Sequence, residues 1–320
     1  MIKTIMLNNE IDFMGVRKPA ATISAVLVIV SIISLAVNSL ELGLDFTSGT
    51  SVRLTYSETV DLGEVNDALS GNGYEEAVVV SFGSDREIRI VLPVDDTVAV
   101  EDQAEQAAVV GETIATLLRA NSTSDITLMG SDYVSAKVGE ELAESGGLGM
   151  LVALGIIMVY IAVRFQFKFS VGAVVALAHD LIITLGIFSL TRMEFNLNTL
   201  AALLAIIGYS LNDTIVVSDR IRENFRRLRT GTPEEMVNVS LNQTLSRTLI
   251  TSLTTLLVLF SILFIGGEST QGFAIALIIG VLIGTYSSIY IASNVILYMN
   301  VTREDLMIPV KEGSELDDIP

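Results

Sequence analysis

The sequence predicts a polytopic α-helical membrane protein with six transmembrane helices and one α+β domain, placed between the first and second helices. Of its 320 residues, 51% are apolar and 18% are charged. The apolar residues form long uncharged runs, and runs of about 18 to 25 residues match the roughly 30 Å hydrocarbon core of a bilayer. The acidic residues concentrate between Glu41 and Glu144, so this segment is expected to lie outside the membrane.

Hydropathy places six spans along the chain. In order they cover Ala20–Val37, Leu148–Val163, Val171–Leu190, Leu197–Val217, Leu241–Ile265 and Phe273–Met299. The first follows two basic residues and is too long and even for the core of a signal peptide, so we interpret it as an uncleaved anchor. The predicted organisation is a segment 1–19, a first helix 20–38, an extramembrane domain 39–140, helices two to six within 141–300 with a loop at about 219–238, and a tail 301–320.

Basic residues indicate which side is cytoplasmic. The segments that alternate to one face carry Lys3, Arg17, Lys18, Arg164, Lys168, Arg220, Arg222, Arg226, Arg227, Arg229, Arg303 and Lys311. Cytoplasmic loops are enriched in Lys and Arg, so both chain ends are predicted inside and the acidic domain on the periplasmic side. The expected location is the bacterial cytoplasmic (inner) membrane, with membrane lipid among the partners.

The segment between the first two spans alternates short strands and helices. We expect strands at Ser51–Tyr56, Ala77–Phe82, Glu87–Leu92 and Asp125–Met129, and helices at Leu62–Leu69 and about Val100–Arg119. This β-α-β-β-α-β order is that of a ferredoxin-like unit. Later in the chain, Thr232, Pro233 and Glu235 form a helix-start signature that predicts a short helix in the loop before the fifth span.

Several function classes have little support. The chain has no cysteine, which excludes disulfides and thiol catalysis, and it has one histidine. The net charge of −18 and the lack of a basic groove argue against nucleic-acid binding. Nucleophile-elbow, zinc-protease and P-loop motifs are absent, so no catalytic residue, cofactor or metal ligand is assigned. Asp180 and Asp213 could form an intramembrane aspartyl protease, but the Gly-x-Gly-Asp surround of that class is missing at both.

Asp213 is the single charge between Phe195 and Ser218. A carboxylate at membrane depth costs at least ~2.5 kcal/mol, and intramembrane acids mark ion pathways by default. Helical spacing places Tyr209 and Ser210 one turn away, so we expect their hydroxyl groups to assist the acid through hydrogen bonds. The alternative is that Asp213 only fixes helix packing.

Further polar groups lie in neighbouring spans. Arg247 is the single charge between Met236 and Gly267, and Thr251 belongs to a polar stripe around it. Arg247 and Asp213 are natural partners, although a long side chain near the cytoplasmic end can also snorkel to the surface. His179 and Asp180 lie inside the third span, where His179 fits a packing role better than a proton relay. We expect the glycines at 280 and 284, and those at 147, 149 and 155, to permit close helix packing.

Two motifs carry a resemblance to a known family. The stretch Gly208 to Thr214, which includes Asn212, continues through Asp219 to Asn224 and closely resembles the fourth-span signature of SecF members of the SecD/SecF family of protein-export membrane proteins. The stretch Leu44 to Thr50 looks like the motif that follows their first span and includes Asp45, Phe46, Gly49 and Thr50. Ser48 stands at the first glycine of that motif, which argues against a glycine-only conformation there.

The resemblance covers nearly the whole chain and implies a function. It implies a complex with SecD that is related to resistance-nodulation-division transporters. This complex would use an H⁺ or Na⁺ gradient to assist late, ATP-independent translocation of unfolded preproteins through SecYEG. YajC is a candidate further partner. The resemblance places Asp213 and Arg247 in the ion pathway, and we add Asp180 and His179 as candidates. Two alternatives stay open: a scaffold that passes no ion, and an independent small-molecule exporter, which is disfavoured because such exporters usually carry both halves.

Overall fold

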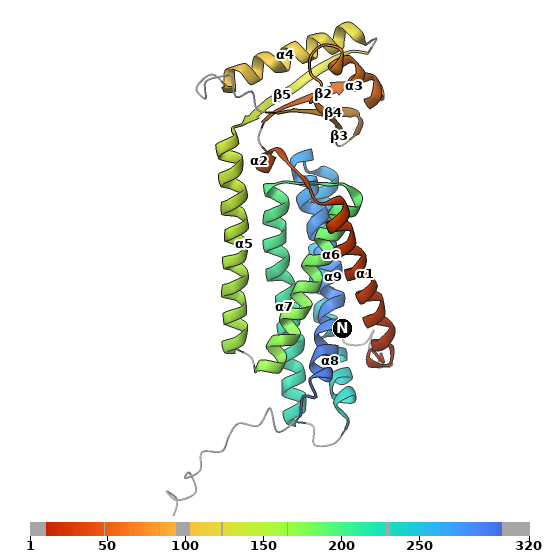
Figure 1. Ribbon diagram of the computed structural model, residues 1–320. Coiled ribbons are helices and arrows are strands. Elements are labelled where there is room, and N and C mark those ends of the chain that lie inside the picture. Colours follow the sequence, from red (N-terminus) through yellow and green to blue (C-terminus); the bar gives the residue numbers. More distant parts are fainter. Residues whose placement is uncertain are drawn as a thin grey trace, which may run out of the picture.

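The long helices form a bundle with a small domain at one end (Figure 1). This computed structural model describes residues 11–47, 49–82, 84–93, 103–122, 124–164, 166–227 and 231–302. Within these ranges six helices are long and apolar enough to cross a membrane. They are α1 (Arg17–Asn38), α5 (Ala136–Arg164), α6 (Phe167–Thr191), α7 (Leu197–Arg227), α8 (Pro233–Ile265) and α9 (Glu268–Tyr298). The prediction of a multi-pass membrane protein with six transmembrane helices is confirmed.

Most of the long helices extend beyond the predicted apolar runs, because hydropathy detects only the part that matches lipid. A 3₁₀ turn (Met14–Val16) leads directly into α1, and α7 continues past Val217 through its basic end. The separate short helix predicted after Thr232 is wrong. Thr232 does form the capping box with Glu235, with Pro233 at the first position, but the helix that it begins is α8 itself.

The extramembrane domain has the predicted ferredoxin-like topology. Its elements are β2 (Gly49–Tyr56), α3 (Leu62–Ser70), β3 (Val78–Phe82), β4 (Ser84–Leu92), α4 (Gln103–Asn121) and β5 (Ile126–Val134). The strands form an antiparallel sheet in the order β3-β4-β2-β5. Helix α4 lies on the side of the sheet that faces away from the long helices (Figure 1).

Alternating side chains build the core of this domain. Val52 and Leu54 of β2, Ile88 and Ile90 of β4 and Ile114 of α4 are almost completely buried. Several bounds differ from the prediction, most of all in two strands: β4 begins already at Ser84 and β5 continues to Val134. Both strands gain residues because pairing with β3 and β2 satisfies the backbone of polar residues that carry no strand pattern of their own.

A joint that the sequence did not predict connects the domain to the helices. Strand β1 (Glu41–Leu42) pairs in parallel with β6 (Glu194–Phe195), which lies between α6 and α7. The short helix α2 (Leu44–Thr47) follows β1 and packs against α5. Two-residue strands have no periodicity, so only the pairing of distant segments could reveal them.

Helix α5 is much less buried than the helices at the centre of the bundle. Only 6% of its most apolar stretch is buried within the chain, compared with 61% for α6 and 50% for both α7 and α9. Figure 1 shows α5 standing beside the bundle formed by the other long helices. Its apolar surface therefore faces lipid or another protein, and the polar groups of interest lie among α6, α7, α8 and α9.

Candidate functional site

Two glycines of α9 allow that helix to approach the polar face of α7. A Cβ atom at Gly280 would lie 2.2 Å from the Ile206 side chain, and one at Gly284 would lie 3.1 Å from the Ser210 Cβ. The prediction of close packing is confirmed at both. At Gly147, Gly149 and Gly155 of α5 nothing in the described chain lies within 4 Å of such an atom, so these glycines do not serve packing within this chain.

Asp213 lies on the buried face of α7, as the helical spacing predicted. Its side chain is 2% exposed, and Ile206, Ser210 and Val217 are buried on the same face. Its Oδ2 atom is buried and has no hydrogen-bond partner among the described residues. A buried polar atom without a partner costs about 1–3 kcal/mol, and more if it is charged. Asp213 therefore lies in the bundle as an acid with unused acceptor capacity.

Arg247 acts on Asp213 without touching it. Its guanidinium on α8 attracts the Asp213 carboxylate electrostatically, but the ion pairs found in the described part of the chain do not include one between these two residues. Arg247 itself is exposed on the surface of the isolated chain. A cation that cannot lose its proton thus lies within electrostatic range of a buried acid without forming an ion pair with it.

The hydroxyl groups expected to assist Asp213 serve other partners. Tyr209 donates to Ser252 Oγ of α8 at 3.1 Å, and Ser210 donates to Asp180 Oδ2 of α6 at 2.5 Å. Asn212 is exposed, and Thr251 donates to carbonyl groups of its own helix. The prediction of local hydrogen bonds to Asp213 is wrong, because α7 lies between α6 and α8 and its hydroxyl groups point across to them.

Asp180 is the centre of a polar cluster that joins three helices. Its side chain has no exposed surface. Oδ2 accepts hydrogen bonds from Ser210 of α7 at 2.5 Å and from Ser287 of α9 at 2.8 Å, and Oδ1 lies 2.9 Å from Nδ1 of His179. Thr184, one turn further along α6, donates to the Asp180 carbonyl. Both oxygens of this carboxylate have partners, in contrast to Asp213.

A second polar chain crosses the bundle beside these acids. Tyr209 of α7 donates to Ser252 of α8, and Ser252 lies 2.7 Å from Thr285 of α9. Hydrogen bonds between helices contribute on the order of 0.6 kcal/mol each in membranes. This row of hydrogen bonds therefore fixes how α7, α8 and α9 are aligned, and it contains no carboxylate, imidazole or amine.

The motif after α1 has a clear structural role in the joint. Asp45 Oδ2 accepts a hydrogen bond from the backbone N–H of Leu197 at 2.9 Å, and Phe46 stacks on Phe195. Gly49 has a φ of 125° and would place a Cβ 2.2 Å from the Leu92 carbonyl oxygen, so only glycine fits. Thr50 is buried at the start of β2. Ser48 lies outside the described residues.

Two family models match this chain, one over the membrane site and one over the motif after α1. A model described as "Protein export membrane protein SecD/SecF, C-terminal" matches residues 113–302, which include Asp180, Asp213 and Arg247. A second, for the SecD/SecF GG motif, matches residues 33–60 around Asp45 and Gly49. The chain belongs to the SecD/SecF family.

Relatives in the SecD/SecF family are similar along almost the whole chain. Protein translocase subunit SecF from Pseudomonas aeruginosa is 46% identical over 97% of this chain and 98% of its own length. Protein translocase subunit SecF from Vibrio alginolyticus is 42% identical, with full coverage of both chains.

A solved structure of the SecD/SecF family is longer than this chain. The crystal structure of SecDF, a translocon-associated membrane protein from a Thermus species, superimposes with a TM-score of 0.80 at 36% identity. The match covers 92% of this chain and 39% of the SecDF chain. This chain therefore spans less than half of that protein.

Two of the cavities of this SecD/SecF chain lie at the joint and inside the domain. One, of 620 Å³, lies in the joint and is lined by charged residues that include Glu41, Arg89, Arg192 and Glu194. Arg89 of β4 forms an ion pair with Glu194, and Arg192 forms one with Glu41 at 3.5 Å. These pairs join the sheet and the exit of α1 to the α6–α7 connection.

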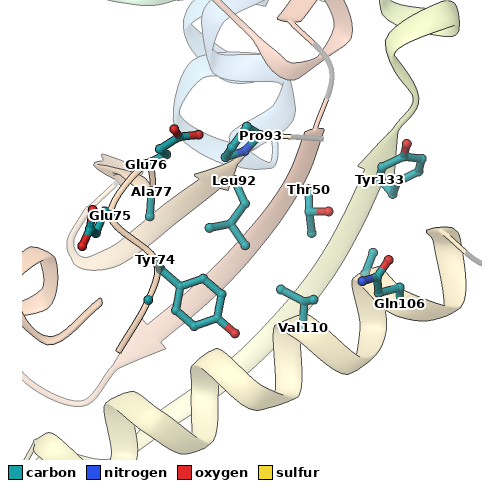
Figure 2. Close-up of a pocket in the computed structure, with 12 residues that line it drawn as sticks. Thr50, Tyr74, Glu75, Glu76, Ala77, Leu92, Pro93, Gln106, Val110 and Tyr133 are labelled. Carbon is teal, nitrogen blue, oxygen red and sulfur yellow. The ribbon is translucent and has the colours of Figure 1, made fainter. Parts of the chain in front are cut away.

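The second cavity, of 440 Å³, lies within the domain between the sheet and α4. Figure 2 shows Tyr74, Leu92 and Val110 gathered around its centre, with Glu75 and Glu76 to one side. Residues 94–102 connect its two sides in sequence, and they lie outside the described part of the chain.

Sequence reasoning missed Ser287 and underestimated Asp180. Ser287 lies on α9 one turn after Gly284, beside Ser288, and a glycine followed by hydroxyl residues on one helix face was the available signal. The described residues contain no group of three His, Asp or Glu side chains that could hold a metal ion. The polar site in the membrane consists of single acids, hydroxyl groups, one imidazole and one guanidinium.

Proposed function

We propose that this chain is the SecF-type subunit of a complex with SecD that uses a proton or sodium gradient to assist late, ATP-independent steps of preprotein translocation through SecYEG. Family membership and relatives named protein translocase subunits support the role in translocation. The solved SecDF chain, of which this chain matches 39%, supports SecD as the partner that supplies the remainder. YajC is a further candidate partner. The role is transport of a polypeptide rather than catalysis of a reaction.

The observation that carries ion coupling is the unpartnered carboxylate oxygen of Asp213 inside the bundle. A charged carboxylate at this depth costs roughly 2.5 kcal/mol or more, and binding a proton or a cation removes that cost. Approach of the Arg247 guanidinium instead favours the carboxylate. Asp213 therefore alternates between an ion-loaded form and a form that Arg247 compensates.

The electrical driving force is large enough for this cycle. Moving one elementary charge across the membrane is worth ~2.3 kcal/mol per 100 mV. A free-energy difference of that size shifts a two-state equilibrium by more than tenfold. Loading of Asp213 in one state and release in the other then converts the gradient into a change in how α7 packs against α8 and α9.

The proposed orientation places the domain in the periplasm. Basic residues gather at the start of α1, the end of α5, the start of α6 and the end of α7, all at the end of the bundle away from the domain (Figure 1). Positive residues favour the cytoplasmic side. The chain then starts and ends inside, in the bacterial cytoplasmic membrane, and its domain faces the side where an exported polypeptide emerges.

A scaffold role is the second candidate, and the joint favours it. Asp45, Phe46 and the Arg89–Glu194 pair hold the domain on the helices with contacts that need no ion. A pure scaffold predicts that substitutions at Asp213 act by loss of the complex. An ion-coupled subunit predicts an intact complex that has lost its response to the gradient.

The test is gradient-dependent export in reconstituted vesicles that contain the complete translocase. Asp213→Asn keeps the size of the side chain and removes its charge, and we expect gradient stimulation of export to fall at least tenfold while SecD still copurifies. Asp219→Asn is the matched control, because Asp219 is an exposed acid on the same helix. Imposing the H⁺ and Na⁺ gradients separately identifies the ion. Unchanged stimulation in Asp213→Asn would exclude the proposal.

A further inference from the structure

His179 is a buried imidazole held from one side only. Its ring is 6% exposed, and Nδ1 lies 2.9 Å from Oδ1 of Asp180, the next residue on α6. Nε2 is buried and has no hydrogen-bond partner among the described residues. A histidine that served only to pack helices would require neither the contact with Asp180 nor a buried Nε2 without a partner.

The surroundings of Asp180 determine which nitrogen of His179 carries hydrogen. Ser210 and Ser287 both donate to Oδ2, which leaves Oδ1 for the imidazole. Three donors around one carboxylate suit its ionised form, which only accepts hydrogen bonds. Nδ1 then carries the hydrogen, and the lone pair of Nε2 is exposed to the interior of the bundle.

Tyr286 connects the imidazole to another helix. The ring of Tyr286 on α9 stacks on His179, with centroids 6.4 Å apart and an interplanar angle of 25°. The Tyr286 hydroxyl donates to the Ala20 carbonyl of α1 at 2.8 Å and accepts from Ser24 at 3.2 Å. The His179 ring therefore lies against a residue whose hydrogen bonds join α9 to α1.

Few other ionisable groups surround this site. The Tyr290 ring packs at a tilt against Tyr286 on α9, and Asp213 lies on α7 one turn from Ser210. Helix α1 carries no charged residue between Pro19 and Asn38, and α5 carries none between Leu148 and Val163. Asp180 is the carboxylate in direct contact with the ring, so it would be the counter-ion of a protonated His179.

We infer that His179 is a proton-binding site separate from Asp213, in which Asp180 fixes the Nδ1–H tautomer and Nε2 takes up the proton. A new N–H bond forms from the Nε2 lone pair, Nδ1 keeps its hydrogen, and the charge of the His179–Asp180 pair changes from −1 to 0. Ser210 links this pair to the helix that carries Asp213. The site adds to the ion-coupled function proposed above, but its protonation is measurable without export.

The chain contains one histidine, so a label on histidine reports this site alone. The experiment is ¹⁵N NMR of the full chain labelled at the imidazole nitrogens, reconstituted with unlabelled SecD and followed from about pH 9 to about pH 5. We expect Nδ1 protonated and Nε2 unprotonated at the alkaline end, and uptake of a proton at Nε2 as the pH falls. An Nε2–H tautomer at alkaline pH, or no change at either nitrogen, would overturn the inference.

Two variants separate this site from Asp213. Asp180→Asn removes the counter-charge, and we expect about a tenfold lower fraction of protonated imidazole at a pH where the native site is half protonated. Asp213→Asn should leave the tautomer and the titration of His179 in place even though gradient-driven export is lost. If His179 stops titrating in Asp213→Asn, the two residues form one site and the inference fails, whatever the outcome for export.

Discussion

Asp180 and Asp213 are two acids in one helical bundle with opposite surroundings. Asp180 has no exposed surface, and both of its oxygens have partners from α6, α7 and α9. Asp213 is almost equally buried, but its Oδ2 has no partner in the described part of the chain. The comparison separates two uses of a buried carboxylate: one joins helices, and the other retains the capacity to bind an ion.

The difference arises from which helix faces each acid. Asp180 of α6 accepts hydrogen bonds from hydroxyl groups on two other helices. On α8, which carries Arg247, the hydroxyl groups of Thr244, Thr251 and Thr254 donate to their own backbone, and the buried Thr248 hydroxyl has no partner among the described residues. A Thr side chain bonded to the preceding turn satisfies itself and gives nothing to a neighbouring acid. These α8 hydroxyl groups therefore do not donate to Asp213, whose Oδ2 has no partner among the described residues.

The largest expected effect comes from replacing each acid by leucine. Asp180→Leu leaves the hydroxyls of Ser210 and Ser287 and the His179 imidazole without their acceptor, and each lost partner costs about 1–3 kcal/mol. Asp213→Leu removes an unpartnered acid, which is expected to be neutral or stabilising by up to ~2.5 kcal/mol. Thermal unfolding of the complex in detergent measures both. Equal destabilisation by the two substitutions would contradict the claim that only Asp180 stabilises the bundle through hydrogen bonds.

A smaller effect is expected where α9 packs on α7 beside these acids. Gly280→Ala places a methyl group against Ile206, and overpacking of this kind costs about 1–3 kcal/mol. Gly147→Ala on α5 is the matched control, because its added methyl group meets no described atom. The same unfolding assay applies. A loss of stability at Gly147 as large as that at Gly280 would show that the difference does not come from packing.

The joint gives a comparison outside the bundle. Asp45→Ala removes the acceptor for the Leu197 N–H at the start of α7, and losses of helix caps cost about 1 kcal/mol. Asp61→Ala removes a similar cap from α3 inside the domain. Hydrogen exchange should increase at the start of α7 only in Asp45→Ala. If Asp61→Ala also increased exchange at the start of α7, the effect of Asp45→Ala could not be assigned to its hydrogen bond in the joint.

The effect that is smallest at neutral pH concerns a buried tyrosine that stays uncharged there. Burial raises the pKa of Tyr56 in β2 from 10.0 to about 12. A folded pKa above the unfolded one means that this contribution to stability is complete below pH 10 and is lost as the pH rises through about 12. Hydrogen exchange of β2 at alkaline pH should show this loss, and Tyr56→Phe should remove the dependence. A dependence that persists in Tyr56→Phe would assign it to another group.

Most of the fold could be predicted from periodicity. Long apolar runs gave the six helices, and alternation in segments such as Ser51–Tyr56 gave the ferredoxin-like order. The β1–β6 pair could not be predicted, because residues 41–42 and 194–195 acquire strand geometry only from each other.

The acids could be identified from sequence, but their hydrogen bonds could not. Asp213 and Asp180 stood out because a charge at membrane depth is costly. Tyr209 and Ser210 were assigned to Asp213 by spacing along one helix, whereas both donate to other helices. The hydrogen-bond partners of a turn depend on which helix packs against it. Contacts such as that of Gly280 with Ile206 determine this packing, and the pattern of one segment does not reveal them.

The most direct test is ion flux through the complex with no preprotein present. Proteoliposomes containing this chain and SecD receive an imposed gradient, and an internal indicator follows the ion. We predict that wild type and Asp219→Asn conduct, and that Asp213→Asn, assembled with SecD to the same extent, does not. Conduction by Asp213→Asn at the wild-type rate would contradict the assignment of the exchangeable ion to this carboxylate.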